Sequence, residues 1–425
     1  MSDPITAILD AHDAPRTRND SQAMLLTLAS EDRSQLGALL LQALDRRSPS
    51  STFLDTALDL LPDEAVAPVC IDAWRRYREG ERSELLTSVL EFASYQAPHT
   101  LQGDWEALLE VAIEDDIQLA PQVWQALPPP LAAQWAHRLT EADDDRELER
   151  AKAVLLATQP ETHAAARGYL ADWSDLDAEV WAHWAGLADG PRLHRLHRLH
   201  GQQPLHLRFG SRQHRAQVAE EPGWRKRIWR LHPTWNGGQV RHVGHMGGPL
   251  DAVCGSCHAP LQRLLQTDAA ALEEGAAGSI TLGLCLDCCG WEDPPVRFYR
   301  HDAEGVPSCH PSQHCEVPIN PTDSGDLMQA EVGLAAMDSH RWQQQDWGQS
   351  NHRQNLSRVG GAPSWVQSAH YPACIDCGEQ MPFVMQLDST LPTTNEGMLL
   401  WGSGGMLYSF WCAKCRVSGH FWQCT

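Results

Sequence analysis

Four cysteine pairs with the spacing C-x-x-C are the residues of this chain most suited to chemistry. They are Cys254 and Cys257, Cys285 and Cys288, Cys374 and Cys377, and Cys412 and Cys415. Two thiolates separated by two residues can bind one metal ion from a tight turn, and a second such turn completes a tetrahedral S₄ site, which favours Zn²⁺. Because four protein ligands leave no position for water, such a site is structural and contributes folding free energy. We therefore predict two structural zinc sites, each with four cysteine ligands.

Other interpretations of these and the neighbouring cysteines stay open. A C-x-x-C pair can form a disulfide or a thioredoxin-type redox site, but a redox motif needs no partner pair and lies beside a βαβ pattern, which this sequence lacks. The segment SCHPSQHC suggests a third metal site, with a His-rich surface loop as the alternative. Its candidate ligands are Cys309, His310, His314 and Cys315.

The two sets of pairs belong to an internal duplication. After Cys257 the chain carries Leu261, Leu264, Leu265, Gln266 and Asp268, and after Cys377 it carries Met381, Val384, Met385, Gln386 and Asp388 at the same offsets. Gly-Gly precedes the first pair of each set, and a β-prone run, 280–284 or 406–411, precedes the closing pair. Agreement at so many offsets predicts two copies of one β-rich unit.

The first half of the chain has to form a different kind of domain. Apolar residues recur at spacings of three and four through residues 20–200, which is the pattern of amphipathic helices. Prolines and glycines separate the periodic segments. Short links between helices of this length favour antiparallel pairs, in a stack that resembles HEAT repeats. Besides the helix around 36–44, the predicted helices are 51–61, 65–77, 83–94, 104–113, 131–139, 146–157, 161–170 and 176–187.

These patterns predict an α+β multidomain protein, in which an all-α stack precedes a duplicated β-rich domain with two zinc-ribbon-like knuckles. The expected parts are an acidic helical domain (1–200), a basic junction (201–240), a first zinc unit (241–300), a connector (301–357) and a second zinc unit (358–425).

The formal net charge of −22 is concentrated in the helical half. Residues 1–200 hold 17 basic and 34 acidic side chains, whereas residues 201–425 hold 16 and 21. One interpretation is a solvated acidic face. The other is a surface that receives a basic protein partner, because surfaces of one sign steer oppositely charged proteins. Direct binding of nucleic acid to this half is disfavoured, because phosphates would be repelled.

A basic segment, residues 192–230, follows the acidic stack. It contains ten Lys and Arg residues and only two acidic ones, Glu220 and Glu221. It can form a helix that pairs with the carboxylates of the stack. Alternatively it contacts RNA or phosphate, with Trp224 and Trp229 as stacking residues.

The sequence offers little for catalysis. It has no P-loop, GxGxxG, GxSxG or HExxH motif. The best candidate for a general base is His352, with Asp346 nearby, as in a nuclease or another hydrolase. A polar loop packed on a sheet accounts for the same residues equally well, so we expect that the protein is not an enzyme.

The chain has seventeen tryptophans, and many lie in Gly-rich loops. Most are expected in the core, where Trp fills small β-domains, and the others are candidate anchors for a protein partner. The candidates are Trp235, Trp342, Trp347, Trp365 and Trp401. The start of the chain shows no secretory signal, and no segment has the roughly 18–20 apolar residues of a membrane span, so a cytoplasmic location without membrane contact is expected.

Several motifs resemble the YwqG-like domains of bacteria and the programmed cell death protein 2 and Tsr4 family of eukaryotes, together called the TYPP group. They are HLRF (206–209), HPTW (232–235), FYRHD (298–302), QDWGQSNHRQN (345–355), RVGGAPSWVQSAHYPACIDCG (358–378), MPFVMQLDS (381–389) and GGMLYSFWCAKC (404–415). The resemblance covers residues 205–425 and implies a duplicated β-rich fold without catalytic residues. It also implies a chaperone or adaptor that holds a client protein, or a bacterial immunity protein. The first repeat departs from the pattern, with Gly247-Gly248-Pro249 where the second has GGAPSW.

Residues and resemblance together predict a non-enzymatic, zinc-stabilised protein that binds a basic client. The client would be a toxin domain to be neutralised by occlusion, or a nascent protein to be chaperoned. A nucleic-acid-binding zinc protein that uses residues 192–230 is the alternative.

Overall fold

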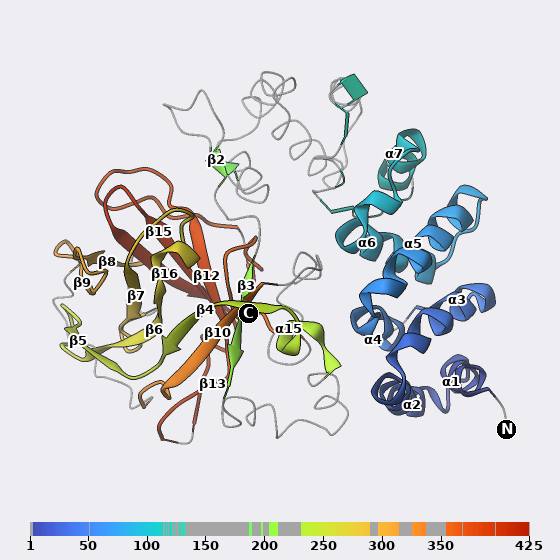
Figure 1. Cartoon of the computed structure of the whole chain (residues 1–425), viewed down its shortest axis with the longest axis horizontal. Helices are drawn as coiled ribbons and strands as arrows, with labels where there is room; N and C mark the ends of the chain where they lie inside the picture. The colour runs from blue at the N-terminus through green and yellow to red at the C-terminus, as the bar shows by residue number, and fades with distance from the viewer. Residues whose placement is uncertain are drawn as a thin grey trace. The chain divides into compact units, whose positions relative to one another are not determined.

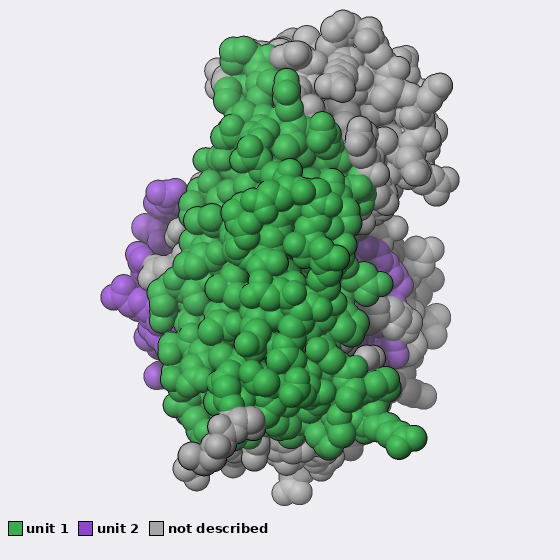
Figure 2. Space-filling model, turned by 90° about the vertical axis from the view of Figure 1, so that its right-hand side faces the viewer, with its two compact units in different colours: residues 1–185, 222–233, 339–344 green, residues 186–221, 234–338, 345–425 purple. Residues whose placement is uncertain are grey.

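The computed structural model describes residues 3–50, 52–113, 204–210, 231–289, 296–313, 325–336, 354–367, 369–395 and 397–424, with a few further residues at 115–131, 187–188 and 197–198. The chain divides into two compact units (Figure 2). The first unit comprises residues 1–185, 222–233 and 339–344, and the second comprises residues 186–221, 234–338 and 345–425. The helices predicted beyond residue 131 and most of the basic segment 192–230 lie outside the described residues.

The described part of the first unit is helical, as the periodicity predicts. Side-chain caps begin two of its helices, because Asp3 accepts from the Thr6 N–H and Ser83 from the Leu86 N–H. The elements are α1 (Pro4–Asp13), α2 (Arg18–Glu31), η1 (Arg33–Gln35), α3 (Leu36–Arg46), α4 (Thr52–Leu60), α5 (Asp63–Arg78), α6 (Glu84–Gln96), η2 (Pro98–Thr100) and α7 (Trp105–Ile113). Sequence periodicity missed α1, which precedes the region where we expected helices.

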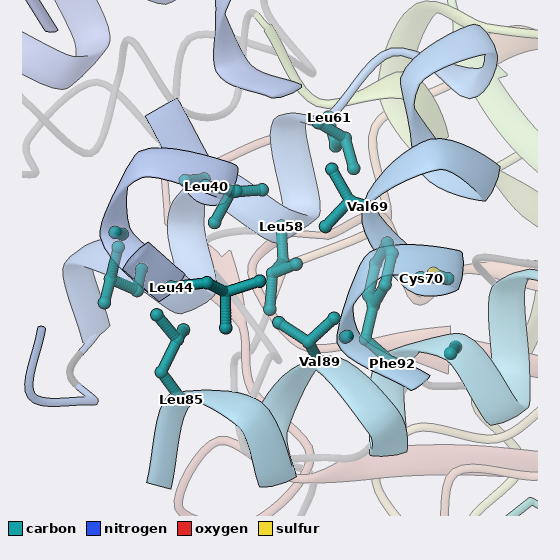
Figure 3. Packing of buried hydrophobic residues seen from close by; sticks show 14 of the residues in the cluster. Leu40, Leu44, Leu58, Leu61, Val69, Cys70, Leu85, Val89 and Phe92 are labelled. Atoms are coloured by element: carbon teal, nitrogen blue, oxygen red, sulfur yellow. The ribbon is translucent and has the colours of Figure 1, made fainter. Parts of the chain in front are cut away.

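The helices pack in two rows. Consecutive helices α1 and α2, α3 and α4, and α5 and α6 contact each other, and α3 also contacts α1 and α5, while α4 contacts α2 and α6 (Figure 1). This is the arrangement of helical-repeat solenoids, in which each pair buries its apolar face against the next. Leucines dominate the core between the rows, and Cys70 lies among them (Figure 3). Cys70 is therefore a small core residue, and burial raises the pKa of its thiol to about 12.

An arginine at the end of α5 connects several acidic side chains of this unit. The guanidinium of Arg76 contacts Asp45, lies 2.6 Å from Asp72 and lies 3.6 Å from Glu81. Only 14% of the Arg76 side chain is exposed, so solvent screens these pairs less than surface pairs.

We expect Arg76→Met to lower the free energy of unfolding of the helical unit by about 2–4 kcal/mol, because Asp72 and Glu81 lose their most buried cation and keep only the exposed Arg75 and Arg47 as partners. Arg75→Met is the matched control. Arg75 is half exposed and pairs with Asp72 and Glu79, so its loss should cost less than about 1 kcal/mol. Urea denaturation followed by circular dichroism at 222 nm measures the free energy of unfolding of both variants. Equal denaturation midpoints for the two variants would contradict the prediction.

The second unit is built on one large antiparallel sheet with the order β5-β6-β4-β10-β3-β11-β12-β15-β16-β8-β9, in which β7 also pairs with β6 (Figure 1). Its strands are β3 (Leu205–Phe209), β4 (Gln239–Met246), β5 (Pro249–Val253), β6 (Pro260–Asp268), β7 (Ser279–Leu284), β8 (Arg297–His301), β9 (Pro307–Cys309), β10 (Ala330–Ala336), β11 (Arg358–Val359), β12 (Phe383–Asp388), β15 (Met406–Cys412) and β16 (Val417–Gln423). Smaller elements are β1 (Leu187–Ala188), β2 (His197–Arg198), α15 (Pro233–Asn236), η4 (Ala269–Ala271), β13 (Leu391–Pro392) and β14 (Met398–Leu399).

The strand order contains the predicted duplication. Strands β10, β4, β6 and β7 succeed one another in the first repeat as β3, β11, β12 and β15 do in the second. The two repeats meet where β10 pairs with β3, and the register matches on both sides. His245 pairs with Glu331 and Gln266 in the first repeat, as Arg358 pairs with His206 and Gln386 in the second. The repeats are thus related by an approximate two-fold axis at the pair of Arg208 and Gly333.

A chain of buried hydrogen bonds joins β8, β16 and β15 in the second repeat. His301 Nδ1 lies 3.2 Å from the Gly305 carbonyl, and His301 Nε2 lies 2.9 Å from Ser418 Oγ. Ser418 Oγ is also 2.9 Å from His420 Nε2, and His420 Nδ1 is 2.8 Å from Ser409 Oγ. The Gly305 carbonyl can only accept a hydrogen bond, so the proton of a neutral His301 lies on Nδ1. When His420 is neutral too, this fixes the donor and the acceptor of every other hydrogen bond in the series. Burial lowers the pKa of His301 to about 4 and that of His420 to about 3.

Candidate metal centres

The fold brings the four cysteine pairs together as two groups of four. Cys254 and Cys257 follow β5, and Cys285 and Cys288 follow β7, so the two turns come from strands on either side of β6. In the second repeat, Cys374 and Cys377 precede β12, and Cys412 ends β15. Within each group, all four sulfur atoms lie within 4.8 Å of one another. Each group could hold a metal ion, as the spacing predicts.

The sulfur–sulfur distances fit a tetrahedral metal ion. Cys254 Sγ lies 3.8 Å from Cys288 Sγ, and Cys257 Sγ lies 3.4 Å from Cys285 Sγ. In the second group, Cys377 Sγ lies 3.8 Å from Cys412 Sγ. A Zn–S bond of about 2.3 Å in a tetrahedron places sulfurs about 3.8 Å apart. All twelve described cysteines are free thiols, so the disulfide alternative has no support among them.

The backbone turn that presents the first pair is the same in both repeats. The His258 N–H donates to the Cys254 carbonyl, and the Gly378 N–H donates to the Cys374 carbonyl. His258 and Gly378 both have positive φ, near 59° and 72°. A turn that reverses the chain this sharply directs both thiols of a pair to one point. The non-glycine residue His258 in this conformation indicates that the surrounding structure holds the turn in place.

A fifth cysteine lies beside the first centre. The Cys309 thiol on β9 donates to the Gln313 carbonyl at 3.8 Å, and its interaction with the Cys254 thiol raises the pKa of Cys309. Hydrogen bonds from the thiols of Cys285, Cys288 and Cys309 hold the pKa of Cys254 far below its usual value. The approach of Cys309 was not foreseen in the sequence, because it depends on β9 lying against β5 and β7, the strands that precede the two cysteine turns.

The proposed third site has only two ligands among the described residues, Cys309 and His310, since His314 and Cys315 lie outside them. The two described side chains have different partners. His310 Nε2 lies 3.1 Å from Asp376 Oδ1, and its Nδ1 lies 2.7 Å from Ser312 Oγ, whereas Cys309 contacts Cys254. His310 therefore connects the β9 turn to the Cys374–Cys377 knuckle, in which Asp376 lies. The four-ligand hypothesis itself stays a prediction.

The tryptophans proposed as partner anchors fall into three groups. Trp365 and Trp401 are 6% and 2% exposed, so the structure places them in the core instead of on a partner surface. Trp365 packs against Tyr408 and Phe410 of β15, so the loop that carries Trp365 lies against the sheet. Trp235 lines a surface pocket beside β3 and β10. Trp342 and Trp347 lie outside the described residues.

The candidate groups for the other activities also lie outside the described residues. They are His352 and Asp346 for hydrolysis, and Trp224 and Trp229 for nucleic-acid stacking. In the basic segment, Arg208 is described, and its guanidinium donates to the carbonyls of Gly237 and Gly238. These contacts give Arg208 a structural role at the end of β3. The two activities remain predictions.

Comparisons with known proteins add one short similarity. No family model matches the chain, and no solved structure matches it. A stretch of 70 residues, 16% of the chain, is 36% identical to a Salmonella typhimurium protein described as uncharacterized protein YpfL. That stretch spans 15% of the length of the Salmonella protein. Within the described residues, no helix is both long enough and apolar enough to span a membrane.

Proposed function

We propose that the protein is a non-enzymatic binding protein whose sheet unit is stabilised by two zinc ions and whose client is a basic protein. The observation that carries this proposal is that each metal centre has a full set of four protein ligands. Each group supplies four thiols, and Zn²⁺ with four protein ligands has no position for a water or a substrate. The metal ions therefore serve the fold, and the function belongs to the surfaces that the fold presents.

The helical unit supplies the surface for a basic client. Among the residues that the structure describes there, eight exposed carboxylates form no ion pair with a described basic side chain. They are Asp3, Asp20, Glu31, Asp32, Glu64, Glu84, Glu106 and Glu110. Unpaired acidic groups steer a basic protein and pair with its Lys and Arg side chains. Immunity by occlusion of a toxin domain and chaperoning of a nascent basic protein are the two roles that fit this chemistry.

The metal content tests the first part of the proposal. We expect about two zinc ions per chain in protein purified under reducing conditions, released when a mercurial reagent modifies the thiols. Elemental analysis and a chromophoric zinc indicator measure both quantities. Fewer than about two zinc ions per chain, or iron in their place, would contradict the two-site assignment.

Co-purification tests the client. The tagged full-length chain, isolated from its source cell at low salt, should retain one basic protein in a stoichiometric amount and lose it as salt rises. A charge-reversed variant with Glu64→Lys, Glu84→Lys and Glu106→Lys should retain less of it. Val306→Asp, which alters an exposed residue of the sheet unit, is the control. Recovery of RNA without a stoichiometric protein would overturn the proposal in favour of nucleic-acid binding.

A further inference from the structure

The duplicated sheet allows each position of one repeat to be compared with its equivalent in the other. In the second repeat, one row across the outer face consists of Tyr408, Gln386, Arg358 and His206. The equivalent row of the first repeat is Thr281, Gln266, His245 and Glu331. Paired residues of an antiparallel sheet project to the same face, so each row forms one continuous strip. Because the two repeats share one sheet through β10 and β3, both strips lie on the same face.

A segment of the chain itself covers the strip in the second repeat. After β11 the chain leaves the sheet and crosses the strip as Pro363, Ser364, Trp365 and Val366. The Ser364 N–H donates to Gln386 Oε1 at 2.9 Å, and the Val366 N–H donates to the Tyr408 hydroxyl at 2.9 Å. Gln386, Tyr408 and Arg358 are all at most 1% exposed beneath it. Side chains of the sheet thus bind the backbone of an extended segment.

Arg358 fixes the same segment from β11. Its guanidinium donates to the Ala362 carbonyl and, at 3.1 Å, to Ser364 Oγ. Successive strands therefore hold successive parts of the segment. Arg358 on β11 contacts residues 362 and 364, Gln386 on β12 contacts residue 364, and Tyr408 on β15 contacts residues 364 and 366. The segment advances by about one residue for each strand that it crosses, from residues 362 and 364 at β11 to residues 364 and 366 at β15.

The first repeat keeps the strip, and no segment of the described residues covers it. After Gly248 the chain stays in the sheet as β5, where Pro249 pairs with Gln262. His245 and Glu331 are exposed and Gln266 is half-buried, and none of their side chains forms a hydrogen bond with another residue in the described part of the chain. Beside them, Val240 and Val243 on β4 are 43% and 53% exposed, although β4 is an inner strand.

A pocket lies at the end of this open strip. Its lining residues include Arg208, Trp235, Val240, Glu331 and Gly333, and its volume is about 310 Å³. Gly333 leaves this space, because a Cβ at that position would lie 2.9 Å from a methyl group of Val240. The volume is at the lower end for ligand pockets, which suits one large side chain, and the indole of Trp235 offers a surface for an aromatic ring.

We propose that the open strip of the first repeat binds an extended segment of the client protein, as the second repeat binds its own residues 362–366. This deepens the proposed function by naming the surface and the segment. Gln266 takes the part of Gln386 and binds the segment's backbone, and the pocket at Gly333 receives an aromatic side chain. The site is continuous, across one sheet face, with the covered interface of the second repeat.

The spacing and charge of the segment follow from the same geometry. Two strand intervals separate Gln266 on β6 from Gly333 on β10, so the aromatic residue precedes the residue bound by Gln266 by about two positions, at one residue for each strand. Exposed Arg241 and Glu331 have opposite charges, so the strip favours an uncharged segment. The occupant is therefore an extended neutral peptide with an aromatic residue two positions before the residue that Gln266 binds.

A synthetic peptide tests the inference directly. The probe is Gly-Ala-Trp-Pro-Ser-Val-Gln with a C-terminal fluorescein, titrated with the zinc-loaded full-length chain and followed by fluorescence anisotropy. The expected result is saturable binding with a dissociation constant below about 1 mM, and at least tenfold weaker binding when Gly replaces the Trp of the peptide. The variants Gln266→Ala and Gly333→Leu should each weaken binding at least tenfold, whereas Val306→Asp, away from the strip, should leave it unchanged.

Two results would overturn the inference. One is the absence of saturable binding up to about 1 mM. The other is a photo-crosslink, from benzophenone placed at the Trp position, that maps outside β4, β10 and α15. Failure here is distinguishable from failure of the proposed function, because the co-purification experiment can still recover a basic protein when the peptide does not bind. In that case the client binds elsewhere on the chain.

Discussion

Zinc removal is expected to unfold the sheet unit while the helical unit stays folded. Each group of four cysteines ties together the turns after two separate strands, and structural zinc sites contribute about 10–16 kcal/mol of apparent binding free energy, which exceeds the stability of most domains. The helical unit has its own leucine core and no cysteine except Cys70. A chelator under reducing conditions should therefore abolish the near-ultraviolet signal of the tryptophans buried in the sheet unit, retain that of Trp74 in the helical unit and retain most of the ellipticity at 222 nm.

A single substitution should remove the zinc ion from one of the two centres. Cys412→Ser removes one thiolate from the second group, leaves three ligands and should lower zinc content by about one ion per chain. Cys424→Ser is the matched control, because Cys424 belongs to neither group. Helical and sheet signals that disappear together on chelation would contradict independent folding of the two units. An unchanged zinc content in Cys412→Ser would contradict the ligand assignment.

Acidification below about pH 6.5 is expected to destabilise the sheet unit through His301 and His420. Their pKa values in the folded chain, about 4 and about 3, lie below the value of about 6.5 in an unfolded chain. The unfolded state therefore binds more protons between pH 6.5 and pH 4, so this stability is present above pH 6.5 and is lost as the pH falls. At pH 5 the loss amounts to about 2 kcal/mol for each histidine.

The structural reason is the direction of the hydrogen bonds. A protonated His301 would turn a second donor toward Ser418 Oγ, which His420 Nε2 already approaches at 2.9 Å. Urea denaturation at pH 7, 6 and 5, with zinc content monitored at each pH, measures the effect separately from metal loss. In His301→Gln, unfolding should take up about one proton fewer in this range, whereas His99→Gln, at an exposed position, should behave as the original chain does. A midpoint independent of pH while zinc stays bound would refute the prediction.

Much of the candidate site could be read from residue spacing. The eight cysteines could be assigned to two groups from the sequence, because two residues separate the thiols within each pair and a β-rich stretch separates the two pairs of each group. The matched offsets around Gln266 and Gln386 predicted two copies of one unit, and the structure places both glutamines at equivalent register positions. Helices were predicted well up to residue 113 for a similar reason, since their apolar spacing is local information.

The roles of Gln386 and Trp365 could not be read in the same way. From the sequence alone, a tryptophan in a Gly-rich loop or a glutamine in an apolar strand can lie either in the core or on the surface. Only the path of residues 362–366 across the sheet buries Trp365 against Tyr408 and brings Gln386 to the Ser364 N–H. The equivalent Gln266 has the same neighbours in sequence and a different environment, because its repeat continues as β5 instead.

The sequence by itself determined the two kinds of domain, the candidate metal ligands and the concentration of acidity in the helical half, because periodicity, ligand spacing and charge are properties of the chain. Tertiary structure alone decided which equivalent strip is covered, where Cys309 and His310 go, and how His301 and His420 come to share one serine. Those contacts join residues up to 117 positions apart, such as His301 and Ser418, through the order of strands in the sheet. No local pattern encodes that order, since it results from how the two repeats pair through β10 and β3.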